Sequence, residues 1–366
     1  MDPRNESVPE DLILQILARL PVKSLIRFKS VSRSFLRLPS DRHFLRLHHE
    51  ISSRNPNLLI ELLDSSGFIT IDPSSLSVSR SSLDFLADRV RIRASSNGVL
   101  CCASVADRGL YYICNPNTRD FRPLPRARER PFTRFQPEYE ATLVALAFDP
   151  STYEYNVVLA GFYRPFGRRP QDRLVCMVFD SAAGSWAKFV SSLCEEFTHM
   201  NRNQVVYSTG ALHWLTHACM YLLVLDLRDL AWRKMSMPEE IAAAGGFAGR
   251  VYLLDFEGSV SVVRIYREWM SVWVLEDYRR ELWVLKDRVN LRCIRGFATS
   301  AFPVSQSKDV VFLATQKKVL TYGRKDKVWR EVYSVGDGCT YPLWFSAHSF
   351  TNTLFPCHQA EWSEVK

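Results

Sequence analysis

The chain has 366 residues, of which 47% are apolar and 23% are charged, and its formal net charge is +8. This composition is that of an ordinary globular protein and excludes an intrinsically disordered chain. No apolar run approaches the roughly 18 residues that a membrane-spanning helix requires. The length suffices for one small and one large domain.

The nine cysteines contain no C-x-x-C pair, and no cluster of histidines stands beside them at zinc-like spacing. The first ten residues, MDPRNESVPE, lack the basic and apolar regions of an export signal. We therefore expect reduced, mostly buried thiols, no metal and no cofactor. The expected compartment is the nucleus, the cytoplasm or both.

Residues 8–44 carry three short apolar stretches at helical spacing. Ser7 and Glu10 have the spacing of a capping box, and Pro9 suits the first turn of a helix. Pro21 separates the first stretch from the second, and Pro39 closes the third. Three helices this short cannot enclose all their apolar side chains, so the sequence predicts an interaction surface here.

The run PEDLILQILARLPVKSLIRFKSVSRSF closely resembles the F-box of plant F-box proteins, from Val8 to about Phe44. Ser32 departs from the cysteine common in that family, and Phe35 from the usual tryptophan. The resemblance implies a non-catalytic unit that docks on a Skp-family adaptor and, through it, on the cullin and RING subunits of a ubiquitin ligase. It places eight residues at or near the adaptor contact: Pro9, Leu12, Ile16, Leu17, Leu20, Pro21, Val22 and Leu25. The alternative is that these residues pack only on the rest of their own chain.

From about residue 57 the chain becomes a series of short β-rich runs separated by turns, such as NLLIELL, RLVCMVFD and SVWVLED. No long helical pattern intrudes, so a sandwich, a barrel or a propeller is expected.

An internal repeat favours the propeller. A strand ends in Asp, Asn or Gly, and an aromatic residue follows six positions later, at about 42 residues per unit. The six copies are Asn115–Phe121, Asp149–Tyr155, Asp180–Trp186, Asp226–Trp232, Asp277–Trp283 and Gly323–Trp329. We expect the acidic side chain to bind amides inside a turn and the aromatic ring to pack between neighbouring sheets. The predicted fold is a small all-α unit of three short helices followed by a large all-β domain, a six-bladed kelch-like β-propeller. Its last blade is expected to pair a strand near NTLFP with one from the start of the domain.

The segments SSNGVLCC, NPNTRDFRPLP, FDPSTYEYNVV and TGALHWL resemble the F-box-associated domain of plant F-box proteins, over residues 95–335. The predicted domains are an F-box at 1–50 and a substrate-binding propeller at 51–366. The resemblance implies the substrate receptor of a Skp–cullin–F-box ubiquitin ligase, in which the propeller presents a protein for ubiquitination. A propeller enzyme and an F-box protein acting outside the ligase are the alternatives.

No motif for a nucleophile elbow, a phosphate loop or a zinc protease is present. His213 is expected to be a satisfied core residue, and the repeat aspartates to be turn formers rather than catalytic acids. The predicted protein is therefore not an enzyme.

Two Pro-punctuated segments, 118–134 and 163–173, are rich in arginine. We expect them to form a basic rim that holds an acidic or phosphorylated segment of the protein substrate. Five residues represent this rim: Arg126, Arg128, Arg130, Arg168 and Arg169. The alternative is that the loops are only solvated; nucleic acid and membrane partners are not expected.

Overall fold

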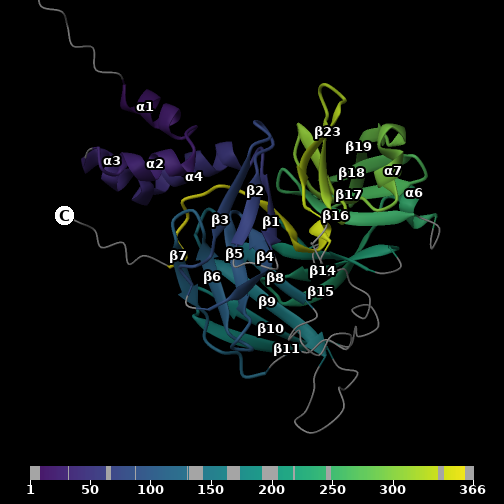
Figure 1. Cartoon of the computed structure of the whole chain (residues 1–366). Coiled ribbons are helices and arrows are strands. Elements are labelled where there is room, and N and C mark those ends of the chain that lie inside the picture. Colours follow the sequence, from purple (N-terminus) through teal and green to yellow (C-terminus); the bar gives the residue numbers. More distant parts are fainter. Residues whose placement is uncertain are drawn as a thin grey trace, which may run out of the picture.

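The structure is a computed structural model that describes residues 9–31, 33–62, 67–86, 88–129, 131, 143–162, 174–191, 205–216, 219–244, 249–336 and 342–358. A small group of helices at the N-terminus lies beside six four-stranded antiparallel sheets (Figure 1). None of the helices in these ranges combines the length and the hydropathy needed to cross a bilayer.

The helical unit contains α1 (Glu10–Leu17), α2 (Val22–Phe28), α3 (Arg33–Arg37), a 3-10 turn (Leu38–Ser40) and α4 (Arg42–Ser52). Pro9 and Pro21 occupy the N-cap positions of α1 and α2, with extended backbones and no capping side chain. Pro9 therefore precedes the first turn instead of lying in it. Ser7, the other half of the expected capping box, lies outside the described residues.

The three short helices expected in this unit are present as α1, α2 and α3, and α4 follows them as a further helix. Asp41 caps this helix by accepting a hydrogen bond from the Phe44 amide at 2.8 Å. Its buried face consists of Phe44, Leu45, His48 and His49. The helix RHFLRLHHEIS is mostly polar, and its only apolar residues are Phe44, Leu45, Leu47 and Ile51. It therefore lacks the high apolar content that marks α1 in the sequence.

Each sheet is a blade, and we name the blades A to F in chain order. The strands of each blade, from the innermost outwards, are as follows. Blade A holds β24 (Ala347–Phe350), β1 (Asn57–Leu62), β2 (Gly67–Ile71) and β3 (Val78–Ser82). Blade B holds β4 (Val90–Ser96), β5 (Val99–Ser104), β6 (Tyr111–Asn115) and β7 (Asp120–Pro123). Blade C holds β8 (Leu143–Phe148), β9 (Tyr155–Phe162), β10 (Leu174–Asp180) and β11 (Ser185–Ser191). Blade D holds β12 (Val205–Ser208), β13 (Ala211–Leu215), β14 (Tyr221–Asp226) and β15 (Ala231–Ser236). Blade E holds β16 (Arg250–Phe256), β17 (Ser259–Tyr266), β18 (Trp269–Asp277) and β19 (Leu282–Asn290). Blade F holds β20 (Phe302–Gln306), β21 (Val310–Ala314), β22 (Lys318–Gly323) and β23 (Trp329–Ser334).

The innermost strands form a closed ring. Each innermost strand contacts the next one around the ring, in the order β24, β4, β8, β12, β16 and β20, and β20 contacts β24 again. Such closure leaves no blade without a neighbour on either side. The prediction of a six-bladed β-propeller is therefore confirmed.

The ring is closed by the C-terminal strand. β24 pairs antiparallel with β1, with His348 opposite Leu59. The expected pairing of a C-terminal strand near NTLFP with a strand from the start of the domain is therefore confirmed, and NTLFP itself follows β24. The buried Asn115 side chain of blade B donates to the carbonyl oxygens of Thr353 and Phe355, at 3.1 and 2.9 Å. These two hydrogen bonds hold the segment after β24 against blade B.

Five of the six repeat copies lie at one equivalent place, the hairpin between the third and fourth strands of a blade. The copy Asp149–Tyr155 does not, because it joins the first two strands of blade C. The missing copy in blade A is Asp72–Val78, between β2 and β3, where valine replaces the aromatic residue. From Asp72 to Gly323 the repeat averages about 50 residues, longer than the predicted 42.

These hairpins share one backbone conformation. The Asp Oδ1 atom accepts amide hydrogen bonds from residues two and three positions on, as for Asp226 with Arg228 and Asp229 at 2.8 and 3.3 Å. The residue four positions on has a left-handed backbone, with φ of 53° at Leu230. The turn-forming role expected for the repeat aspartates is therefore confirmed.

The aromatic residues of the repeat pack between blades, as expected. Trp186 of blade C donates its indole N–H to the Pro125 carbonyl after blade B, at 2.6 Å. Trp283 of blade E donates to the Ser236 carbonyl of blade D at 2.9 Å.

The propeller has two unlike faces. The turns between first and second strands lie on one face, where neighbouring turns bind one another: Asn97 donates to the Phe148 carbonyl, and Ser208 to the Gly258 carbonyl, both at 2.8 Å. The helical unit touches this face, since Arg46 donates to the Ser151 carbonyl at 3.2 Å. We call it the helix-side face. Because the strands are antiparallel, turns between second and third strands, and the connections between blades, lie on the opposite or distal face.

Candidate functional site

The eight residues expected at the adaptor contact fall into two groups. Pro9, Leu12, Ile16 and Pro21 are exposed, and Leu20 is partly buried. Leu12 and Ile16 stand one turn apart on α1 and keep 49% and 55% of their surface in contact with solvent. These two side chains are available to another protein.

Leu17, Val22 and Leu25 form the second group and are buried, with at most 6% exposure. They share a core cluster with Phe44 and Leu45 of α4. Their burial stabilises the helical unit and places the exposed residues of α1. The alternative that all eight residues pack only on their own chain does not hold for Leu12 and Ile16.

The helical unit exposes two further apolar side chains, Val31 and Leu36, at 64% and 56%. Both belong to the third apolar stretch of the sequence but were not placed at the contact. The sequence could not predict that these two side chains are exposed, because their apolar spacing suits a stripe facing the core equally well.

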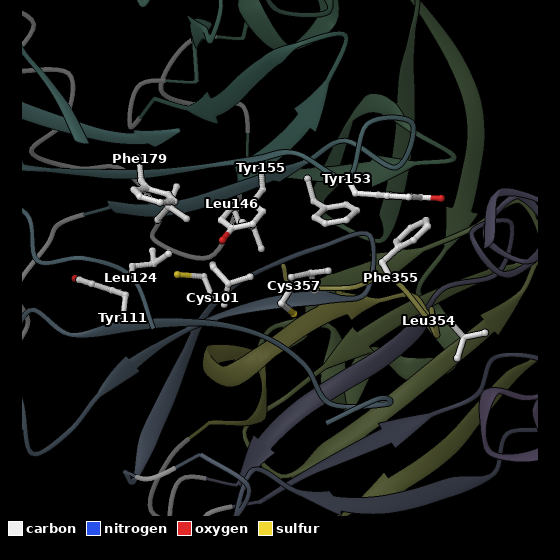
Figure 2. Close-up of a cluster of buried hydrophobic side chains, with 14 of the residues drawn as sticks. Cys101, Tyr111, Leu124, Leu146, Tyr153, Tyr155, Phe179, Leu354, Phe355 and Cys357 are labelled. Carbon is white, nitrogen blue, oxygen red and sulfur yellow. The ribbon is translucent and has the colours of Figure 1, made fainter. Parts of the chain in front are cut away.

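An aromatic cluster joins the helical unit to the propeller, and Figure 2 shows Phe355 pointing toward Tyr153 within it. The centre of the Phe355 ring lies 4.9 Å from the centre of the His49 ring of α4, 5.2 Å from that of Phe148 and 5.4 Å from that of Tyr153. Arg42 of α4 lies over the Tyr153 ring at 5.7 Å. The helix α4, blade C and the segment after β24 therefore share one packed core.

The five arginines of the expected basic rim are only partly described. Arg126 is exposed and pairs with Asp107, and Arg128 is exposed. Arg130, Arg168 and Arg169 lie outside the described residues. Nearby, Glu129 accepts from Lys188 of β11 at 2.5 Å. The described part of this segment thus follows β7 on the distal face, with some of its charge already compensated.

The centre of the ring encloses a cavity of about 770 Å³ that the sequence did not reveal. Inner strands of all six blades and residues 53–56, just after α4, line it. Burial raises the pKa of Asp255 in this lining to about 6, while Asp309 pairs with Lys325 at 2.9 Å. No group of three or more potential metal ligands occurs in the described ranges.

His213 is a satisfied core residue, as expected. It is fully buried, with Nδ1 3.1 Å from the Val206 carbonyl and Nε2 3.0 Å from the Tyr278 hydroxyl. Burial lowers the pKa of His213 to about 4, which keeps the ring neutral.

The cysteines match the expectation of buried thiols. Five of the seven described free cysteines are buried. Burial raises the pKa of Cys101 to about 12, which disfavours a reactive thiolate.

The fold defines a class: a six-bladed β-propeller protein with an N-terminal helical unit. Two family models match the chain in this arrangement, an F-box domain over residues 6–47 and an F-box associated beta propeller domain over residues 67–332. The chain belongs to the family of F-box proteins with an F-box associated β-propeller.

The relatives are consistent with this assignment. F-box protein At5g49610 of Arabidopsis thaliana is 51% identical over 96% of this chain and 98% of its own length. Putative F-box/kelch-repeat protein At1g12870 of the same plant is 26% identical over 65% of this chain and 60% of its own. Among solved structures, the β-propeller domain of Cps50 (Swd1) from Myceliophteria thermophila is similar with a TM-score of 0.40 and 13% identity, over 76% of this chain and 85% of that one.

Proposed function

We propose that this F-box protein is the substrate receptor of a Skp–cullin–F-box ubiquitin ligase and has no chemistry of its own. Its helical unit would bind a Skp-family adaptor, and its propeller would hold a protein substrate. The contribution to catalysis is proximity, since the receptor keeps the substrate near the conjugating enzyme of the ligase.

The observation that carries this proposal is the exposed apolar pair on α1. Leu12 and Ile16 remain exposed although the helical unit already has a complete core built from Leu17, Val22 and Leu25. Exposed apolar side chains on a folded unit mark a docking surface, and the F-box domain as a family implies an adaptor of the Skp type.

The test exchanges both residues, as Leu12→Asp with Ile16→Asp. Charges buried at the contact without partners should cost at least about 3 kcal/mol and weaken adaptor binding more than about a hundredfold. Leu17 is a poor position for this test, because its burial means that Leu17→Asp would unfold the helical unit.

A matched control is Leu282→Asp with Val328→Asp, which alters two residues of the propeller that are 52% and 43% exposed. The control should bind a purified Skp-family adaptor as the wild type does. Undiminished adaptor binding by the α1 variant would contradict the proposal. Adaptor binding without recruitment of the cullin would instead support an F-box protein acting outside the ligase.

We place the protein substrate on the distal face, which lies away from the helical unit. Arg126 and Arg128 remain candidates for its recognition, although Asp107 already compensates Arg126. An acidic segment of the substrate is the expected ligand of such arginines.

A further inference from the structure

A second concentration of arginine on the distal face lies at the end of the β17–β18 hairpin. We call it the blade E patch and define it as Arg264, Tyr266, Arg267, Trp269 and Arg288. Tyr266 and Trp269 are 41% and 39% exposed, although large aromatic residues are usually buried.

The strand register places the patch on one face of the sheet. Tyr266 is opposite Trp269, and Ser271 is opposite both Arg264 and Arg288. Paired residues project to the same side, and so do residues two apart. Arg267 belongs to the two-residue turn of the hairpin and is exposed.

The arginines lie over the aromatic rings. The guanidinium carbons of Arg264 and Arg267 are 4.8 and 5.2 Å from the centre of the Tyr266 ring. Arg288 lies 5.0 Å from the centre of the Trp269 ring. A guanidinium stacked in this way keeps its N–H edge available for a planar anion.

The patch is also held in place from behind. A Cβ atom at Gly249 would lie 2.6 Å from the Ile265 carbonyl and 3.2 Å from the Tyr266 ring, so this glycine, with φ of 84°, allows close packing there. Arg264 donates to the Glu240 carbonyl of α6 (Glu239–Ala242) at 3.4 Å. Ordering these side chains before binding lowers the entropy lost when a partner docks.

The local charge is not balanced. Glu268, in the same turn, is engaged by Arg292 at 2.6 Å. Among the described residues, no carboxylate forms an ion pair with Arg267 or Arg288. Exposed tryptophan, tyrosine and arginine with uncompensated positive charge are typical of the centre of a protein-binding site.

We propose that the blade E patch binds an acidic protein segment, whose aspartate or glutamate side chains pair with Arg267 and Arg288. The inference rests on the proposed function, because that segment would belong to the substrate. It adds a specific site, in blade E, to the distal face.

A protein segment fits the patch better than single-stranded nucleic acid. Base recognition needs free aromatic faces for stacking. Here the protein's own guanidinium groups lie over Tyr266 and Trp269. Carboxylates, by contrast, are the planar acceptors that match the exposed guanidinium edges.

The test measures fluorescence anisotropy of a labelled Glu-rich peptide with the full chain, and uses Arg267→Ser with Arg288→Ser. The matched control is Arg279→Ser with Arg280→Ser, two exposed arginines at the helix-side end of the same blade. Both variants lose two positive charges. We expect the patch variant to bind the peptide about tenfold more weakly and the control to stay within about twofold of the wild type.

Three results would overturn the proposal: no binding of the Glu-rich peptide by the wild type, equal weakening in both variants, or tighter binding of a labelled single-stranded RNA at the patch. Adaptor binding is measured on the same samples. Its retention together with loss of peptide binding isolates the patch, whereas failure of the wild type to bind the adaptor would count against the proposed function alone.

Discussion

At the scale of single residues, Glu61 shows how burial sets the charge of a side chain within the propeller. It lies on β1, is 7% exposed, accepts from the Ile92 amide at 3.3 Å and lies 3.7 Å from Arg91. Burial outweighs the nearby positive charge and raises the pKa of Glu61 to about 7. The carboxyl group therefore favours its neutral form in the folded protein.

The sign of the resulting pH dependence follows from proton binding. Between pH 4.5, the ordinary value, and about pH 7, the folded state holds more protons at Glu61 than the unfolded state does. The contribution of Glu61 to stability is therefore complete below pH 4.5 and is lost as the pH rises through 7. His49, His213 and His348 act in the opposite direction, because burial lowers the pKa of each to about 4.

We predict that Glu61→Gln, which stays neutral, is more stable than the wild type at pH 8, by up to about 3 kcal/mol. The two proteins should have similar free energies of unfolding at pH 4.5, and the histidine contribution should cancel between them. Chemical denaturation at both pH values checks this. Glu331→Gln, at an exposed position on β23, is the control and should show no such divergence. A constant difference across this range would contradict the assignment.

At the scale of elements, the segment after β24 joins parts that are far apart in the sequence. Phe355 is fully buried between α4 and the β8–β9 turn. The buried backbone of this segment is satisfied by Asn115 and by Asp120, whose Oδ2 accepts from the Cys357 amide at 2.7 Å. These C-terminal residues therefore help to set the orientation of the F-box relative to the propeller, together with the contacts of Arg42 and Arg46 with the β8–β9 turn.

We predict that Phe355→Ala destabilises the protein by about 3–5 kcal/mol, because it leaves a cavity that neither α4 nor the turn can fill. Thermal unfolding measures the loss, and limited proteolysis between α4 and β1 should become faster. Phe297→Ala, at a position that is 36% exposed, is the control and should cost little. Wild-type resistance to proteolysis in the Phe355 variant would show that the junction is held elsewhere.

At the scale of the whole molecule, one strand decides whether the ring exists. β24 pairs with β1 and touches β4 and β20, so it completes blade A and closes the circle. Without it, β1 would present an unpaired edge and two blades would lose a neighbour.

We predict that a chain ending at residue 345 does not unfold cooperatively and aggregates through the open edge. Circular dichroism during thermal unfolding, with size-exclusion chromatography, checks this. A synthetic peptide of residues 342–358 added in trans should restore part of the cooperative transition by supplying β24. A sharp, wild-type transition in the truncated chain would show that ring closure is dispensable.

The sequence by itself determined the F-box and the all-β character. The predicted number of six blades was also right, although one of the copies behind it, Asp149–Tyr155, lies elsewhere in blade C and the blade A copy was missed. Those features depend on local patterns: α1 and α2 have a regular apolar stripe, and four of the six blades repeat an Asp or Asn turn followed by an aromatic residue. Such patterns act over a few residues, so they can be seen without knowing the fold. Outer strands such as β3, with its polar sequence VSRSS, carry no such pattern and were not recognised.

Only the tertiary structure decided which residues are exposed and which are equivalent. Leu12 and Leu17 look alike on the sequence, but one faces solvent and the other faces α4. Asp149 matched the repeat by spacing, but it lies between the first and second strands of blade C. Asp72, which the repeat did not include, lies between the third and fourth strands of blade A, as the other copies do in their blades. The central cavity and the blade E patch likewise depend on strand pairing and ring closure. These are long-range contacts, and no local pattern records which distant segments will meet.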